Sequence, residues 1–193
     1  MSVTGEPDHL PGGGPQKVGV ALTDILTGMY ATTAIQAAII ERDKSGLGQH
    51  IDLALLDVQV ACLANQSMNY LVSQNIPKRM GNAHPNIVPY QTFQTADGFI
   101  ILTVGNDSQF ADFCQVAECQ ALIQDPRFTT NQARVRNREI VVETLAAIIK
   151  AKSSTFWLQQ LEIKGVPCGP INDIDEVFDN PQIKHRKMLA ELS

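Results

Sequence analysis

The chain has 193 residues, of which 44% are hydrophobic and 18% are charged, and its formal net charge is -5. This length and hydrophobic content allow a packed core in one or two domains, which excludes a disordered or fibrous protein. Fifteen basic residues stand against twenty acidic ones, and no basic stripe is interleaved with aromatic residues, which argues against a nucleic-acid-binding protein.

The first seventeen residues predict a polar, turn-rich segment. It contains Gly12, Gly13 and Gly14 between two prolines, but the Lys-Ser/Thr pair of a phosphate loop does not follow. We therefore expect a surface turn at these glycines. Because an α/β domain normally opens with a strand, we also expect this chain to be the middle piece of a longer fold.

A long helix is predicted from about Ile25 to Gly46. No charged residue lies between Ile25 and Ile40, and apolar residues occupy every face of the helix, so we expect it to be buried all round. Gly46 suits a left-handed C-cap. One carboxylate, Asp24, stands at the start of this helix, where an N-cap is the commonest explanation of an aspartate.

The next segment, "HIDLALLD" at 50–57, alternates well enough to predict a short strand, and residues 58–74 predict a second helix. Asp52 in that strand and Asp57 at the helix start are explained by solvent exposure and by capping. A segment rich in Pro, Gly and Asn at 75–89 then divides the chain into two parts.

The second part predicts a small α+β unit. "YQTFQTADGFIILTVG" at 90–105 indicates a β-hairpin around Asp97-Gly98, because both residues tolerate positive φ. Three helices are expected after it, at 108–117, 138–152 and 155–165. The second should bury the face that carries Val141, Leu145 and Ile148, and the third should end at Gly165.

Three arginines, Arg134, Arg136 and Arg138, precede an amphipathic helix. Guanidinium groups suit carboxylate substrates, but a solvated charged helix face is the ordinary outcome and is the explanation that we favour. We expect Phe156 and Trp157 to belong to the core rather than to a cofactor site.

The four cysteines predict reduced thiols. They include no C-x-x-C pair and have no histidine at ligand spacing, so neither a zinc site nor a redox dithiol is expected. No apolar run is long enough for a membrane span and no signal-peptide pattern is present. A cytoplasmic protein fits these features. The cysteines are Cys62, Cys114, Cys119 and Cys168.

Four blocks of sequence, in the correct order, resemble the family III coenzyme A (CoA) transferases, the CaiB/BaiF-like group that includes formyl-CoA and carnitine CoA-transferases. The blocks are "KVGVALTDILTGMYATTAIQAAIIERDKSGLGQHIDLALLD", "RMGNAHPNIVPYQTFQTADGFIILTVGN", "DPRFTTNQARVRNR" and "GVPCGPINDIDEVFDNPQ". The resemblance implies an α/β fold in which a fragment of a Rossmann-like large domain is followed by a linker and a small α+β domain. The boundaries implied are 1–56 for the partial large domain, 57–80 for a linker helix, 81–162 for the small domain and 163–193 for a return linker.

The resemblance also implies a catalytic residue. In this family the carboxylate matched by Asp24 is a nucleophile that passes through an aspartyl-CoA intermediate. The Rossmann-like half that carries most CoA contacts is absent, so we expect the isolated chain to be inactive.

A loop in the second block resembles the glycine-rich loop that shields the acyl intermediates from water. It consists of Gly81, Asn82, Ala83, His84 and Pro85. Only Gly81 is kept where some members have a run of glycines. Two interpretations of His84-Pro85, a rigid turn and a direct substrate contact, stay open, and a metal role for His84 is not expected.

The implied substrates are an acyl-CoA and a carboxylic acid, with no tightly bound cofactor, no metal, no nucleic acid and no membrane. "IVPYQTF" followed by "VGN" leans toward the members that use dicarboxylates. The resemblance further implies an interlocked homodimer. Two alternatives remain: an α-methylacyl-CoA racemase of the same fold, in which the matching aspartate is an acid/base, and a noncatalytic assembly module.

Overall fold

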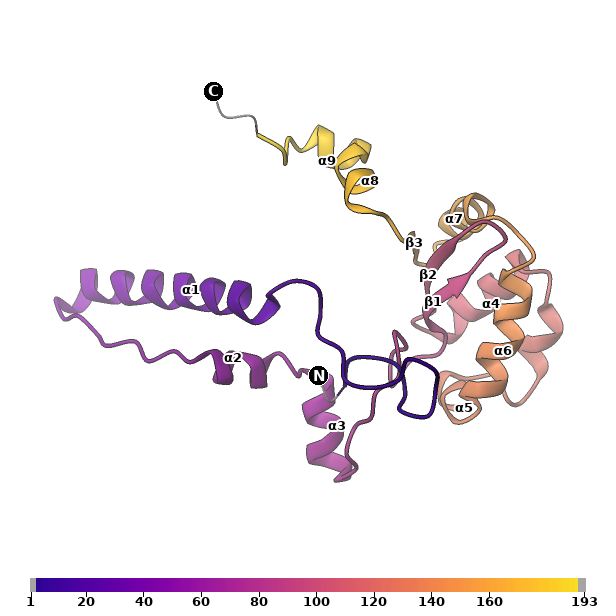
Figure 1. Cartoon of the computed structure of the whole chain (residues 1–193), viewed down its shortest axis with the longest axis horizontal. Coiled ribbons are helices and arrows are strands. Elements are labelled where there is room, and N and C mark those ends of the chain that lie inside the picture. The colour runs from indigo at the N-terminus through magenta and orange to yellow at the C-terminus, as the bar shows by residue number, and fades with distance from the viewer. Residues whose placement is uncertain (1–2, 191–193) are drawn as a thin grey trace. The chain divides into compact units, whose positions relative to one another are not determined.

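The computed structural model describes residues 3–190. The chain divides into two compact units, residues 1–81 and residues 82–193 (Figure 1). No helix in the described part of the chain is both long enough and apolar enough to cross a lipid bilayer.

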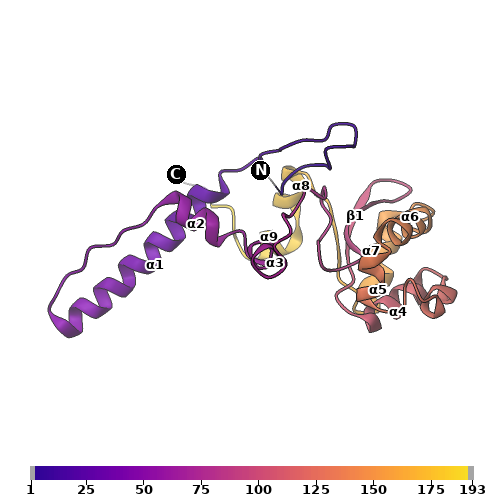
Figure 2. The ribbon, with the colours of Figure 1, turned by 90° about the horizontal axis from the view of Figure 1, so that it is seen from below.

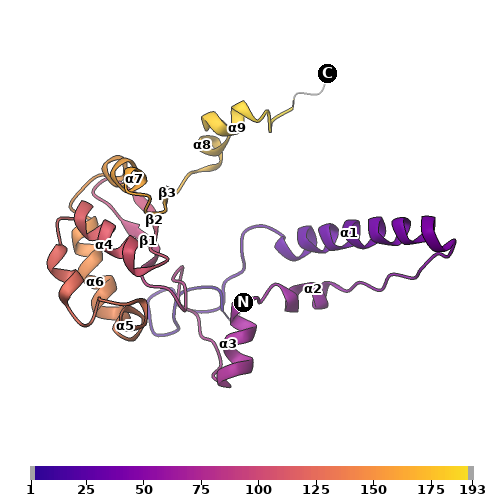
Figure 3. The ribbon, with the colours of Figure 1, turned by 180° about the vertical axis from the view of Figure 1, so that it is seen from behind.

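The first unit consists of a turn-rich segment followed by three helices, α1 (Leu22–Ser45), α2 (Leu55–Ala61) and α3 (Asn65–Ser73). The backbone of α1 ends at Gly46 in the left-handed region, with φ 75°, which confirms the predicted helix and its C-cap. The amide of Gly13 donates to the carbonyl oxygen of Leu10 at 2.9 Å, as in a surface turn. Figures 1 and 3 show α2 beside the first half of α1.

The expectation that α1 is buried on all sides is wrong for this chain. None of its residues is buried, because the main packing partner of α1 in the described part of the chain is the short helix α2. Seven of its large apolar side chains are 44–61% exposed, and they are Leu22, Ile25, Met29, Tyr30, Ile35, Ile39 and Ile40.

Two further expectations for the first unit are wrong. Residues 50–57 form no strand, since the described part of this unit offers no second strand with which they could pair. The predicted helix at 58–74 is instead two helices, and the chain turns between them at Ala64, whose φ is 46°. An alanine with positive φ leaves no signal in an apolar pattern, because left-handed positions normally favour glycine or asparagine.

The second unit contains a three-stranded antiparallel sheet in the order β1-β2-β3. Its strands are β1 (Tyr90–Gln94), β2 (Phe99–Thr103) and β3 (Cys168–Pro170). Tyr90 lies opposite Thr103, and Ile100 lies opposite Pro170. The predicted hairpin is therefore confirmed, and β3 adds a third strand from the segment expected to be a return linker.

The turn of this hairpin is held by side chains rather than by positive φ, which corrects the predicted reason for it. Neither Asp97 nor Gly98 lies in the left-handed region. The Asp97 carboxylate accepts hydrogen bonds from the Ser154 amide at 2.7 Å and from the Thr95 hydroxyl at 3.1 Å. The same hydroxyl oxygen accepts from the Gly98 amide at 3.0 Å.

Helices gather beside the sheet in the second unit (Figure 2). They are α4 (Asp107–Val116), the 3-10 helix η1 (Gln120–Gln124), α5 (Asn131–Arg136), α6 (Arg138–Ile149) and α7 (Ser154–Ile163). Two short helices, α8 (Ile174–Asp179) and α9 (Pro181–His185), follow β3 in the sequence and do not belong to this group. The three helices predicted in this part correspond to α4, α6 and α7. Gly165, with φ 67°, follows α7 as expected.

The core of the second unit surrounds Trp157, whose ring lies 5.9 Å from that of Phe113. The indole nitrogen of Trp157 donates to the Ile149 carbonyl oxygen at 2.8 Å, so its one polar atom is satisfied in the core. Phe156 packs edge-on against Trp157, and both aromatic residues belong to the core as predicted. Helix α6 buries Ile149 rather than Ile148, which is only partly buried.

The overall architecture is thus a mixture of helices with one small antiparallel sheet. The Rossmann-like large domain stays a prediction, because the described part of the first unit contains helices and no strand. The four domain boundaries stay predictions as well.

Candidate active site

Asp24 is the third residue of α1 and lies in its first turn. The N-cap position is held by Ala21, and no side chain caps the helix, so the explanation of Asp24 as an N-cap is wrong. Its side chain is exposed. The backbone amides of a first turn have no acceptor within the helix, and the positive end of the helix dipole lies at this turn.

Asp24 lines a groove of about 860 Å³ in the first unit. The groove runs between the start of α1 and the chain between α2 and α3, where Cys62 and Asn65 contribute to it. The Thr23 hydroxyl, next to Asp24, donates to the side-chain oxygen of Gln59 across the groove. Among the described residues that line it, Asp24 is the one acidic side chain and Lys17 the one basic side chain.

The rival carboxylates lie outside this groove. Asp52 and Asp57 are both exposed, and neither contributes to its lining. Asp57 occupies the third position of α2, as Asp24 does in α1, and it caps nothing because Ala54 is the N-cap. Capping therefore fails as an explanation of Asp57, while solvent exposure holds.

The predicted substrate loop is shared between the two units. Gly81 closes the first unit: its φ is 62°, and its amide donates to the Gly5 carbonyl oxygen at 3.0 Å. A Cβ atom at Gly81 would lie 2.8 Å from the carboxylate oxygens of Glu6, a side-chain end that can move aside, so glycine is favoured here by φ. Asn82, Ala83, His84 and Pro85 open the second unit.

His84 is fixed against the first strand of the sheet. Its ring stacks on Tyr90, with centroids 5.1 Å apart and planes 5° apart, and its amide donates to the Tyr90 carbonyl oxygen at 2.9 Å. The Asn86 amide donates to Nδ1 at 3.1 Å, so Nδ1 is an acceptor and the neutral ring carries its proton on Nε2. Burial, and then the charge of Arg138, lower the pKa of His84 below its ordinary value of 6.5.

The loop is also held from α5 and α6. The Arg138 guanidinium donates through Nη2 to the carbonyl oxygens of His84 and Pro85, at 2.8 Å each. Asn131 donates through Nδ2 to the Asn86 carbonyl oxygen at 2.8 Å and accepts from the Val88 amide at 3.1 Å. This segment is therefore a rigid turn of the second unit.

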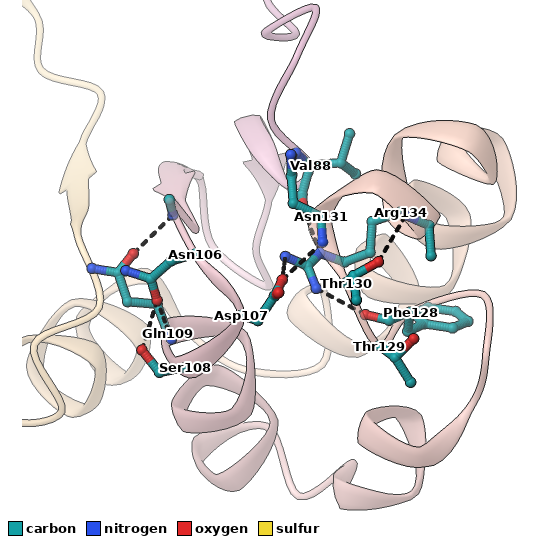
Figure 4. A network of polar contacts seen from close by, with 12 residues as sticks. Val88, Asn106, Asp107, Ser108, Gln109, Phe128, Thr129, Thr130, Asn131 and Arg134 are labelled. Atoms are coloured by element: carbon teal, nitrogen blue, oxygen red, sulfur yellow. Dashed lines mark hydrogen bonds and ion pairs between the residues drawn. The ribbon is translucent and has the colours of Figure 1, made fainter.

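Arg134 is buried beneath the same segment (Figure 4). It donates to the carbonyl oxygens of Val88 at 2.7 Å and Phe128 at 2.8 Å, and to the Asp107 carboxylate at 2.9 Å. Its guanidinium lies 4.4 Å from the Phe110 ring centroid. Every nitrogen of Arg134 thus has a partner, which leaves it a structural residue.

The expectation of a solvated arginine face is therefore wrong for Arg134 and Arg138, and it is right for Arg136, which is exposed. Helical spacing relates the three residues Asn131, Arg134 and Arg138, and it places them on the same face as the buried residues of α6. This periodicity is the sequence signal that indicates their burial.

No group of His, Cys, Asp and Glu side chains in the described part of the chain is arranged to hold a metal ion. The four cysteines, all of which are described, are unpaired. The Cys119 thiol has a lowered pKa because it accepts a hydrogen bond from Cys114, whose own pKa is raised by that bond and by burial.

Known proteins resemble the chain along its whole length. The succinate–glutarate CoA-transferase of Agrobacterium fabrum is 50% identical over 192 residues, which cover 100% of this chain and 47% of that protein. The succinyl-CoA:glutarate CoA-transferase of Homo sapiens is 42% identical, with 43% of its length covered. The chain thus spans about half the length of the curated relatives it matches.

Solved structures agree with these relatives. The crystal structure of a CAIB/BAIF family protein from Brucella suis matches with a TM-score of 0.76 and 49% identity, over 97% of this chain and 49% of that one. Rv3272 from Mycobacterium tuberculosis matches with a TM-score of 0.82 and 25% identity, over 95% of this chain and 47% of that one. The family model of CoA-transferase family III matches residues 1–193, and the chain belongs to this family.

Proposed function

We propose that the protein, at its natural length, transfers CoA between an acyl-CoA thioester and a free carboxylic acid, with Asp24 as the nucleophile. The observation that carries this proposal is the position of Asp24. It is the single acidic residue among the described lining of the groove, and it lies in a helix first turn where it caps nothing. The names of the relatives support the same reaction class.

In the proposed first half-reaction, the Asp24 carboxylate attacks the thioester carbonyl carbon. The carbon–sulfur bond breaks, CoA leaves as the thiolate, and a mixed anhydride forms. The thiolate then attacks the Asp24 carbonyl carbon, which releases the first acid and leaves an aspartyl-CoA thioester. The acceptor acid repeats these steps in reverse, so no oxidant or reductant is needed.

The environment of Asp24 suits an attacking carboxylate. The first turn of the helix places Asp24 near backbone amides that have no acceptor within the helix. Lys17 supplies a positive charge in the same groove. We propose that the loop from Gly81 to Pro85 shields the acyl intermediates from water, as the resemblance to the family implies.

The names of the relatives also suggest the substrates. Because two of them are named for succinate or succinyl-CoA and glutarate, we propose a dicarboxylate as the acceptor acid and its CoA thioester as the donor. CoA then acts as a substrate, with no tightly bound cofactor. A homodimer and a cytoplasmic location remain predictions.

The test compares Asp24→Asn with Asp57→Asn in the protein at its natural length. Asp57 is a matched control, because it is also exposed and also third in its helix. Loss of a nucleophile should lower the transfer rate by several orders of magnitude, whereas Asp57→Asn should leave it unchanged. Near-normal turnover of Asp24→Asn would overturn the proposal.

A trapping experiment separates covalent transfer from proton chemistry. The wild-type protein is incubated with succinyl-CoA, treated with hydroxylamine and digested, and the peptide that contains Asp24 is examined by mass spectrometry. A hydroxamate on Asp24 is expected for an anhydride or aspartyl-CoA. If no adduct forms and the α-proton of a 2-methylacyl-CoA exchanges with solvent, the protein is a racemase instead.

A further inference from the structure

Two neighbouring arginines of the second unit differ in how many of their guanidinium nitrogens donate hydrogen bonds. Arg134 is fully buried, faces a carboxylate, and donates through Nε, Nη1 and Nη2. Arg138 is partly exposed and directs Nη2 at two carbonyl oxygens of the candidate substrate loop. Its Nη1 is buried and has no hydrogen-bond partner.

Arg138 also lacks a counter-charge. None of the ion pairs among residues 3–190 includes it. Burial lowers the pKa of its guanidinium, which reflects the cost of holding this charge away from water. A merely structural arginine would be expected to resemble Arg134, with a carboxylate partner and all donors in use.

The contacts of Arg138 determine how His84 is presented. Both acceptors are backbone carbonyls, so the hydrogen bonds fix the peptide planes on either side of Pro85. The ring of His84 is held by Tyr90 on one face, and its Nδ1 is occupied by the Asn86 amide. The remaining donor of the neutral ring is Nε2–H.

We propose that Arg138 is a positioning residue of the CoA-transfer reaction, which fixes the turn at His84 and Pro85 so that the loop adopts one conformation around the acyl intermediates. This inference rests on the proposed function and adds to it a residue that is remote from Asp24 in sequence. Its positive charge, which forms no ion pair with a carboxylate of residues 3–190, also favours the approach of an anionic acceptor acid.

The test uses Arg138→Met, Arg138→Lys and the control Arg136→Met in the protein at its natural length. Arg136 is exposed on the adjoining helix α5 and has no place in the site. With succinyl-CoA and glutarate, Arg138→Met should raise the ratio of hydrolysis to transfer about tenfold, as expected when charge-assisted hydrogen bonds that order a loop are lost. The KM for succinyl-CoA should stay within about twofold, since the proposal gives Arg138 no part in binding the thioester substrate.

The lysine variant distinguishes positioning from charge. Lysine keeps the charge but lacks the planar fork that reaches two carbonyls, so we expect the acceptor KM to be retained and the hydrolysis ratio to rise. An unchanged ratio in both Arg138 variants, with an active wild type, would overturn the inference. An inactive wild type would instead overturn the proposed function.

A measurement on the 193-residue chain itself tests the positioning without any activity. In NMR spectra of the imidazole groups, His84 should lose its ring-current shift from Tyr90 in Arg138→Met, and its pKa should rise because a nearby positive charge has been removed. The Trp157 fluorescence of each variant reports whether the core remains folded. A folded Arg138→Met variant with an unchanged His84 signal would contradict the positioning role.

Discussion

Replacing Arg134 with Met tests whether one buried side chain supports the segment that carries the candidate loop. The substitution removes the donors to the carbonyl oxygens of Val88 and Phe128, and both of those residues are also buried. Each buried acceptor left without a partner costs about 1–3 kcal/mol. The ion pair adds little, about 0–1 kcal/mol, because the Asp107 side chain is 51% exposed.

The expected loss of unfolding free energy is therefore about 2–5 kcal/mol. Relief of the buried guanidinium charge, whose pKa burial lowers, keeps the value from being larger. Met fills similar space against Phe110, so that cavity formation is not the main cause.

Urea denaturation followed by Trp157 fluorescence measures this change, because the single tryptophan lies in the same core. The control Arg136→Met should stay within about 0.5 kcal/mol of the wild type. Asp107→Asn removes the charge beside the buried guanidinium but keeps both carbonyl contacts and a side-chain oxygen, so it should lose less than Arg134→Met. If Arg134→Met lost as little as Asp107→Asn, the two carbonyl contacts would contribute nothing, and the reasoning from unsatisfied acceptors would be refuted.

Two further predictions concern the hairpin and the exposed helix. The pKa of Asp97 is lowered, chiefly by the hydrogen bond from the Ser154 amide, so its stabilising contribution is complete above the unfolded value of 3.8 and is lost as the pH falls through the lower folded value. Asp97→Asn should therefore flatten the acid limb of a stability–pH curve as the pH falls below 3.8, and superimposable limbs would contradict this. The 193-residue chain should associate as its concentration rises, because the apolar face of α1 is uncovered. A monomer by light scattering at high concentration would show that the face is covered in solution.

The elements that could be predicted from the sequence are those whose signals are local. The apolar run of α1 with its terminal Gly46, and the strands on either side of Asp97-Gly98, carry their patterns within a few residues. The prediction of a strand at 50–57 fails because a strand also needs a second strand with which to pair, and pairing is not a local property of the sequence. The prediction of one continuous helix at 58–74 fails for another reason. The chain turns at Ala64, and alanine normally avoids the positive φ that this turn requires.

The sequence predicts the position of Asp24 in the first unit better than it predicts the environment of the arginines in the second. The position of Asp24 at the start of α1 followed from the helix pattern, although its exact place in the first turn did not. The sequence pattern predicts solvent exposure for Arg134 and Arg138, because a charged side chain near a helix start normally faces water. Arg134 and Arg138 instead continue the stripe of Val141 and Leu145. Their burial is made favourable by acceptors that the local pattern does not reveal: the carbonyl oxygens of residues 84, 85, 88 and 128 and the carboxylate of residue 107.

Asp24 and the loop at His84 differ in how many packing contacts within this chain fix their orientation. In the described part of the first unit Val58 is the one buried apolar side chain, whereas the buried core cluster lies wholly in the second unit. The loop at His84 is consequently oriented by contacts within this chain, and substitutions at Arg134 or Arg138 act on a unit with its own core. The helix that carries Asp24 has no comparable packing, so the orientation of its carboxylate depends on whatever covers α1. The 193-residue chain can therefore report on the loop, whereas the role of Asp24 has to be measured in the protein at its natural length.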